Sequence, residues 1–174
     1  LFFLDQVYFT TFASGPNSFL LPITAHETAH QWWYGLVGND QAMEPWLDEA
    51  LAVYSERIFY QYNYPNYGDW WWTFRVNPFG PEGHVDSSVY GFSTFREYID
   101  AVYLNGAECL DDLRTRVGDE AFFAFLLEKE TLKKADRRKG KFRTFLLATL
   151  TNFLANEWDK RQTLKRGGQR EIIS

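Results

Sequence analysis

Two histidines and a glutamate near the start of the chain have the types and the spacing of a metal centre. His26, Glu27 and His30 form a His-Glu-x-x-His pattern in a stretch that is compatible with a helix. Each helical residue advances about 100°, so His26 and His30 return to one face, about 6 Å apart along the axis. Two imidazoles at that separation can share one zinc ion, and Glu27 lies beside it, where a bound water would sit.

A second glutamate completes the set of ligands. Glu49 follows His30 after eighteen residues, within the segment Trp-Leu-Asp-Glu-Ala. A helix that returns antiparallel after a loop over residues 38–44 can place Glu49 over the histidine pair. Two histidines and one glutamate leave a fourth position for water, as in a catalytic zinc site. We therefore expect one Zn²⁺ per chain, held by His26, His30 and Glu49, with Glu27 as the general base.

These motifs resemble those of the membrane-alanyl aminopeptidase family, which are gluzincin zinc metallopeptidases and include the leukotriene-epoxide hydrolase. That family carries His-Glu-x-x-His, eighteen further residues, and then a glutamate in a Trp-Leu-Asn-Glu-Gly-type segment. The chain keeps the Trp, the Leu and the Glu, and has Asp48 for Asn and Ala50 for Gly. The resemblance is specific over about residues 23–60 and 95–126.

The resemblance also implies roles for residues outside the metal set. Tyr103 opens a Tyr-x-x-Gly-Ala segment, whose tyrosine in the family donates a hydrogen bond to the oxyanion of the tetrahedral intermediate. Tyr98 matches a tyrosine of some members. Glu56 lies seven residues after Glu49, on the same helical face, and is a candidate partner for the second N–H of a metal-bound histidine. The alternatives are core packing for the tyrosines and a surface ion pair for Glu56.

The sequence pattern of the segments that carry these residues predicts a mainly α (α+β) fold. Residues 1–11 are aromatic and β-branched, which favours a short N-terminal strand. Pro22 can open a helix that carries the histidines and ends near Gly35 or Gly38, and a second helix is expected over residues 46–62. The resemblance implies that this helical framework is a thermolysin-like catalytic core.

The rest of the chain continues the helical pattern. Further helices are expected over residues 93–117, 121–133 and 142–160, with a break near Gly106. Residues 63–92 are rich in Asn, Pro, Gly and Trp without a clear period, so a long irregular loop is expected there. We assign residues 1–160 to one zinc metallopeptidase catalytic domain, which we expect to be truncated at its N-terminal side, and residues 161–174 to a flexible basic tail.

Composition and charge limit the remaining functions. A chain of 174 residues with 45% apolar residues can bury a core, and its one cysteine excludes an internal disulfide. No apolar run approaches the roughly 18 residues of a membrane span. The net charge of −5 divides into 6 basic and 19 acidic residues over 1–130, and 12 basic and 4 acidic residues over 131–174. An acidic body suits a cationic group such as a peptide's amine, and an ordinary solvated surface is the alternative. The basic stretch has no aromatic interleaving that would indicate nucleic-acid binding.

The sequence thus predicts zinc-dependent hydrolysis of peptide substrates, most simply the removal of their N-terminal residues. One alternative is an endopeptidase or another hydrolase that uses the same metal core. A different class is a non-catalytic binding or scaffold module that keeps zinc for folding. Release of N-terminal residues from fluorogenic amides separates the first two functions, and turnover of any peptide separates both from the third.

The substrate's amine defines one more expectation. Aminopeptidases of the resembled family hold it with a glutamate in a Gly-x-Met-Glu-Asn segment, about two dozen residues before His26, and residues 1–3 offer no such segment. The chain begins without Met, so we expect a fragment whose anchor either lies just upstream or was never present, with acidic residues such as Asp48 as partial substitutes. We expect this chain alone to prefer a free N-terminus only weakly over its acetylated twin.

Overall fold

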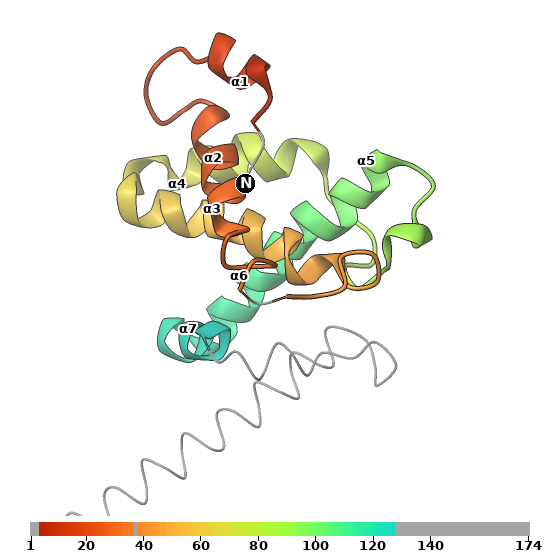
Figure 1. Cartoon of the computed structure of the whole chain (residues 1–174). Coiled ribbons are helices and arrows are strands. Elements are labelled where there is room, and N and C mark those ends of the chain that lie inside the picture. Colours follow the sequence, from red (N-terminus) through yellow and green to blue (C-terminus); the bar gives the residue numbers. More distant parts are fainter. Residues whose placement is uncertain (1–3, 37, 128–174) are drawn as a thin grey trace, which may run out of the picture. The chain divides into compact units, whose positions relative to one another are not determined.

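The computed structural model describes residues 4–36 and 38–127, and their contacts belong to two compact units, 1–117 and 118–174 (Figure 1). The first unit is built from helices and turns, and no strand occurs in its described residues. Its α-helices are α1 (Gln6–Thr10), α2 (Leu20–Ala29), α3 (Glu49–Asn63), α4 (Gly68–Trp71), α5 (Phe95–Tyr98) and α6 (Asn105–Val117). Its 3₁₀ turns are η1 (Pro45–Leu47), η2 (Pro65–Tyr67), η4 (Asn77–Phe79) and η5 (Val89–Gly91). Two π-helical turns are η3 (Trp72–Val76) and η6 (Ile99–Leu104).

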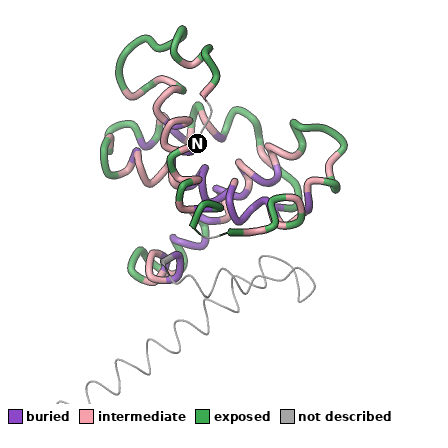
Figure 2. Tube along the Cα trace, viewed as in Figure 1, coloured by how far each residue is buried: buried purple, intermediate pink, exposed green. Residues whose placement is uncertain are grey.

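Helix α3 is the central element of the first unit. It packs against α2, α6 and η6. The five consecutive residues from Ala50 to Tyr54 expose 2% or less of their surface, so this end of the helix is enclosed on every side (Figure 2). A helix that is apolar all round is a buried helix, and the sequence Ala-Leu-Ala-Val satisfies that requirement. The predicted helix over residues 46–62 is confirmed, with η1 as its first turn.

Helix α2 ends earlier than predicted. Ala29 is its last residue and His30 is its C-cap, so the expectation that it continues to Gly35 or Gly38 is wrong. The chain turns instead at Tyr34, whose φ is +78°, and the Gly35 N–H donates back to the His30 carbonyl at 3.1 Å. A Cβ at Gly35 would lie 2.5 Å from the Gln31 carbonyl oxygen, so this tight turn requires glycine.

The predicted N-terminal strand is also wrong within the described residues. Residues 6–10 form helix α1. The Asp5 side chain caps it by accepting a hydrogen bond from the Val7 N–H at 2.9 Å, and the Thr11 N–H donates to the Val7 carbonyl at 2.9 Å. This local capping outweighs the β propensity of the aromatic and branched residues.

The segment over residues 63–92 is more ordered than the predicted loop. It contains η2, α4, η3, η4 and η5 in succession. Trp71 is fully buried, and Trp70 stacks between Tyr60 and Phe74 at ring-centroid distances of 5.7 Å each. The packing of these tryptophans stabilises the short helices. No sequence period predicts such packing, so the segment reads as a loop from the sequence.

The later helices agree with the sequence in outline. Residues 95–117 are helical, and the expected break near Gly106 is a change from π to α geometry at Asn105. In the second unit, α7 (Asp119–Leu127) corresponds to the helix expected from residue 121. The helix over 142–160, the basic tail over 161–174 and the far end of the 1–160 domain lie outside the described residues. Among residues 4–36 and 38–127, no helix is long and apolar enough to cross a membrane.

Gly106 permits the close approach of α6 to α3, and this contact is testable. A Cβ at position 106 would lie 2.5 Å from the Ala50 Cβ. Gly106→Ala should therefore lower the free energy of unfolding by about 1–3 kcal/mol, because the two helices must separate. Urea denaturation measures the change. Gly91→Ala is the matched control, since its Cβ would meet only Ser87 at an ordinary 3.5 Å, and an equal loss in both variants would contradict the packing argument.

Candidate metal centre

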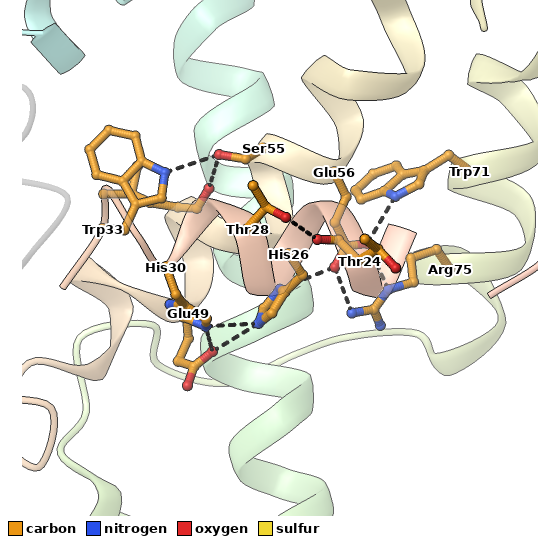
Figure 3. Close-up of polar contacts among 11 residues, drawn as sticks. Thr24, His26, Thr28, His30, Trp33, Glu49, Ser55, Glu56, Trp71 and Arg75 are labelled. Atoms are coloured by element: carbon orange, nitrogen blue, oxygen red, sulfur yellow. Dashed lines mark hydrogen bonds and ion pairs between the residues drawn. The ribbon is translucent and has the colours of Figure 1, made fainter. Parts of the chain in front are cut away.

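Three side chains, from α2, its C-cap residue and α3, converge on one point (Figure 3). The Nε2 atoms of His26 and His30 are 3.1 Å apart. The Glu49 Oε2 atom lies 3.3 Å from the first nitrogen and 3.4 Å from the second. The side chains are 7%, 20% and 17% exposed in the order His26, His30, Glu49. The structure thus brings together the three residues that the spacing predicted as ligands.

The geometry of this triangle fits a tetrahedral zinc ion. Ligands at about 2.0–2.1 Å from a tetrahedral metal are separated from one another by about 3.3 Å. The three observed separations, 3.1, 3.3 and 3.4 Å, lie around that value. Two imidazole nitrogens and one carboxylate oxygen are also a donor set that zinc accepts. Three protein ligands leave the fourth tetrahedral position for a water or a substrate atom.

The electrostatics of the cluster favour a positive charge at its centre. Burial alone would lower the pKa of His26, but its contacts with Glu49 and Glu56 raise that pKa to about 9. Burial alone would raise the pKa of Glu49, but its contacts with His26 and His30 lower it to about 2. Both shifts have one cause, because a carboxylate held among imidazoles in a buried place stabilises a cation there. A divalent metal ion would supply that charge.

A network around Asp48 fixes the start of α3. Asp48 is fully buried, and its carboxylate accepts hydrogen bonds from Asn39 at 3.1 Å and from Gln41 at 2.6 Å. Its carbonyl accepts the Ala52 N–H at 2.8 Å. These bonds tie the loop before α3 to its first turn and so orient Glu49. Each Asp48 oxygen already accepts one of these hydrogen bonds, and the expectation that Asp48 partly substitutes as an amine anchor stays a prediction.

Glu56 lies on the other side of His26. Its Oε1 atom is 3.2 Å from His26 Nδ1, which is the contact that the sequence predicted for a partner of a metal-bound histidine. Glu56 is fully buried, and Arg75 and Trp71 also donate hydrogen bonds to it. Burial would raise the pKa of Glu56, but the charge of Arg75 and the hydrogen bonds lower it. Sequence reasoning missed Arg75 and Trp71, because they lie in the segment that has no period.

Two tyrosines complete the described site. The Tyr103 ring stacks on His26 at 5.9 Å between centroids, with an interplanar angle of 8°. Burial, followed by the negative charge of Glu49 and a hydrogen bond to it, raises the pKa of the Tyr103 hydroxyl. Tyr98 meets Tyr103 edge to face at 5.3 Å, and burial and the Glu49 charge raise its pKa to about 12. Both phenols therefore stay protonated at neutral pH and can donate hydrogen bonds.

Glu27 occupies the position next to the ligand pair. It is half-buried on α2 between His26 and His30. Consecutive helical residues differ by about 100°, so its side chain leaves the helix beside the ligand face and not toward the ligand atoms. That is the placement expected of a residue that contacts a water at the metal and is not itself a ligand.

The comparison with known families agrees with this geometry. The family described as "Peptidase family M1 domain" matches residues 13–157, which is most of the chain. The match includes all the residues described above as members of the site. No solved structure matches the chain significantly.

The triangle makes a direct prediction about metal content. His30→Ala removes one of three protein donors, so the purified variant should lose most of its zinc after dialysis, as measured by elemental analysis. His84→Ala is the matched control, because His84 is exposed and outside the cluster. Stoichiometric zinc in His30→Ala would show that His30 is not a ligand.

Proposed function

The chain belongs to peptidase family M1, and from that premise we propose that it is a zinc-dependent metallopeptidase that removes N-terminal residues from peptides. One observation carries the zinc-dependent part of the proposal: three ligand-type atoms of His26, His30 and Glu49 form a triangle of zinc-site size. The aminopeptidase part rests on the resemblance of the sequence motifs to the membrane-alanyl aminopeptidase family.

The proposed chemistry assigns one task to the metal and the others to side chains. Zinc in this triangle would supply a water of pKa near 7 and a Lewis acid for the scissile carbonyl. The Glu27 carboxylate accepts a proton from the attacking water and then delivers it to the nitrogen of the leaving amine. Its half-buried position beside the ligands supports this role, since proton transfer requires contact with the water without coordination of the metal.

Tyr103 is proposed to stabilise the oxyanion. Attack on the carbonyl places negative charge on its oxygen, and a phenol O–H held in a water-poor site stabilises that charge strongly. Burial and the negative charge of Glu49 raise the pKa of the Tyr103 hydroxyl, so it stays protonated and can act as a donor. Tyr98, which packs against Tyr103, is the second candidate donor.

The substrate class is tested with two kinds of peptide. Fluorogenic aminoacyl amides report release of an N-terminal residue, and internally quenched peptides with blocked ends report internal cleavage. An aminopeptidase turns over the first kind preferentially. Faster turnover of the blocked peptides would favour an endopeptidase on the same metal core.

Glu27→Gln tests the general base. The amide keeps the size of the side chain but cannot accept the proton, so we expect retention of zinc and a loss of about 10²–10⁴ in kcat. Steady-state kinetics and elemental analysis on the same preparation separate the two effects. Glu82→Gln, at an exposed position, serves as the control. Comparable activity in Glu27→Gln and wild type would assign the base to another residue.

Tyr103→Phe tests the oxyanion donor. The variant keeps the ring that stacks on His26 but loses the hydroxyl. We expect kcat to fall by roughly 10²–10³ with KM little changed, because the hydrogen bond forms mainly in the transition state. Tyr90→Phe, at a tyrosine that is 78% exposed, should leave both constants unchanged. A rise in KM alone would indicate that Tyr103 binds the substrate and does not stabilise the oxyanion.

A further inference from the structure

Glu56 is the most heavily bonded carboxylate of the described site. Oε1 faces His26 Nδ1 at 3.2 Å and accepts from Arg75 Nη2 at 2.9 Å. Oε2 accepts from Arg75 Nε at 2.9 Å and from Trp71 Nε1 at 3.1 Å. The carboxylate is fully buried, and all four of these partners are nitrogens (Figure 3).

We propose that Arg75, assisted by Trp71, is a positioning residue that orients the ligand His26 through Glu56. The inference rests on the proposed zinc site, and it adds two residues from α4 and η3 to the machinery that controls the metal. Within the described residues, neither Trp71 nor Arg75 makes a hydrogen bond or an ion pair with His26, His30 or Glu49, so their effect on the metal must pass through the Glu56 carboxylate.

The geometry explains how the effect is transmitted. The Arg75 guanidinium binds both Glu56 oxygens with two parallel N–H donors, which fixes the plane of the carboxylate as well as its place. With the plane fixed, Oε1 faces His26 Nδ1. A carboxylate that accepts a hydrogen bond from the Nδ1–H favours the tautomer whose Nε2 lone pair is free for a metal, and it holds the ring in one orientation.

Trp71 and Arg75 reach Glu56 together because of their spacing. They lie four residues apart on consecutive helical turns, so they share one face. The Trp71 indole is fully buried, and its N–H donates a second hydrogen bond to Glu56 Oε2 beside the one from Arg75. The Arg75 side chain is 12% exposed, so its pairing with Glu56 is shielded from solvent. A surface ion pair could not hold a carboxylate this firmly.

The test measures zinc affinity in the full chain by competition with a chromophoric chelator. Arg75→Lys keeps the charge beside Glu56 but loses the two-donor fork, and Trp71→Phe keeps the ring but loses one N–H. We expect a zinc dissociation constant about 10–100 times that of wild type for Arg75→Lys, and a smaller increase for Trp71→Phe. Arg116→Lys is the matched control, because Arg116 pairs with Asp112 at an exposed position, and its zinc affinity should stay within about twofold.

A second readout separates positioning from simple stabilisation. The absorption spectrum of the cobalt-substituted protein reports ligand geometry, and it should change in Arg75→Lys even where thermal unfolding shows a folded protein. Unchanged zinc affinity and an unchanged cobalt spectrum in both site variants would overturn the proposal while leaving the zinc site in place. Failure of the wild-type chain to bind zinc would overturn the proposed function and this inference together.

Discussion

The imidazole of His26 is held between two carboxylates of one helix, and the rest of the site depends on this arrangement. Glu49 faces its Nε2 at 3.3 Å and Glu56 faces its Nδ1 at 3.2 Å. Seven helical residues rise by about 10.5 Å, which is enough to place one carboxylate on each side of a single ring. The position of the His26 ring along α3 is therefore fixed by its two contacts. A shift of α2 along α3 would break both contacts at once.

This constraint explains why α3 is enclosed. A helix that must present two charged residues to one ring cannot tilt or rotate, and tight packing on every side prevents both movements. The buried run from Ala50 to Tyr54 lies between the two glutamates and packs on neighbouring helices. Gly106 brings α6 into contact with Ala50 in the same region, so the element that follows Tyr103 is seated on the helix that carries Glu49. The residues that pack the core of α3 are thus the direct neighbours of the glutamates that contact His26.

The sequence predicts those parts of the site that follow from the period of one helix. The His26–His30 spacing and the Glu49–Glu56 spacing each place two residues on one face of a helix. The structure brings these residues together as expected. Its errors have other physical causes. The chain leaves α2 after Ala29 and turns through a positive φ at Tyr34, which no period predicts, and the first described residues follow a side-chain cap and not their β propensity. Arg75 contacts Glu56, nineteen residues away in the sequence, through tertiary packing, and no local sequence pattern predicts such a contact.

The π-helical turn η6 shows how a departure from regular geometry serves a site. Tyr98 and Tyr103 are five residues apart, and in a regular α-helix they would point about 140° away from each other. A π turn pairs residues i and i+5, which brings the two positions toward one side. The two rings meet at 5.3 Å, and burial, followed by the negative charge of Glu49, raises the pKa of both hydroxyls. From the sequence the two tyrosines are alternatives for one role. The π turn makes them neighbours, so the irregular turn brings together two aromatic rings that a regular α-helix would point apart.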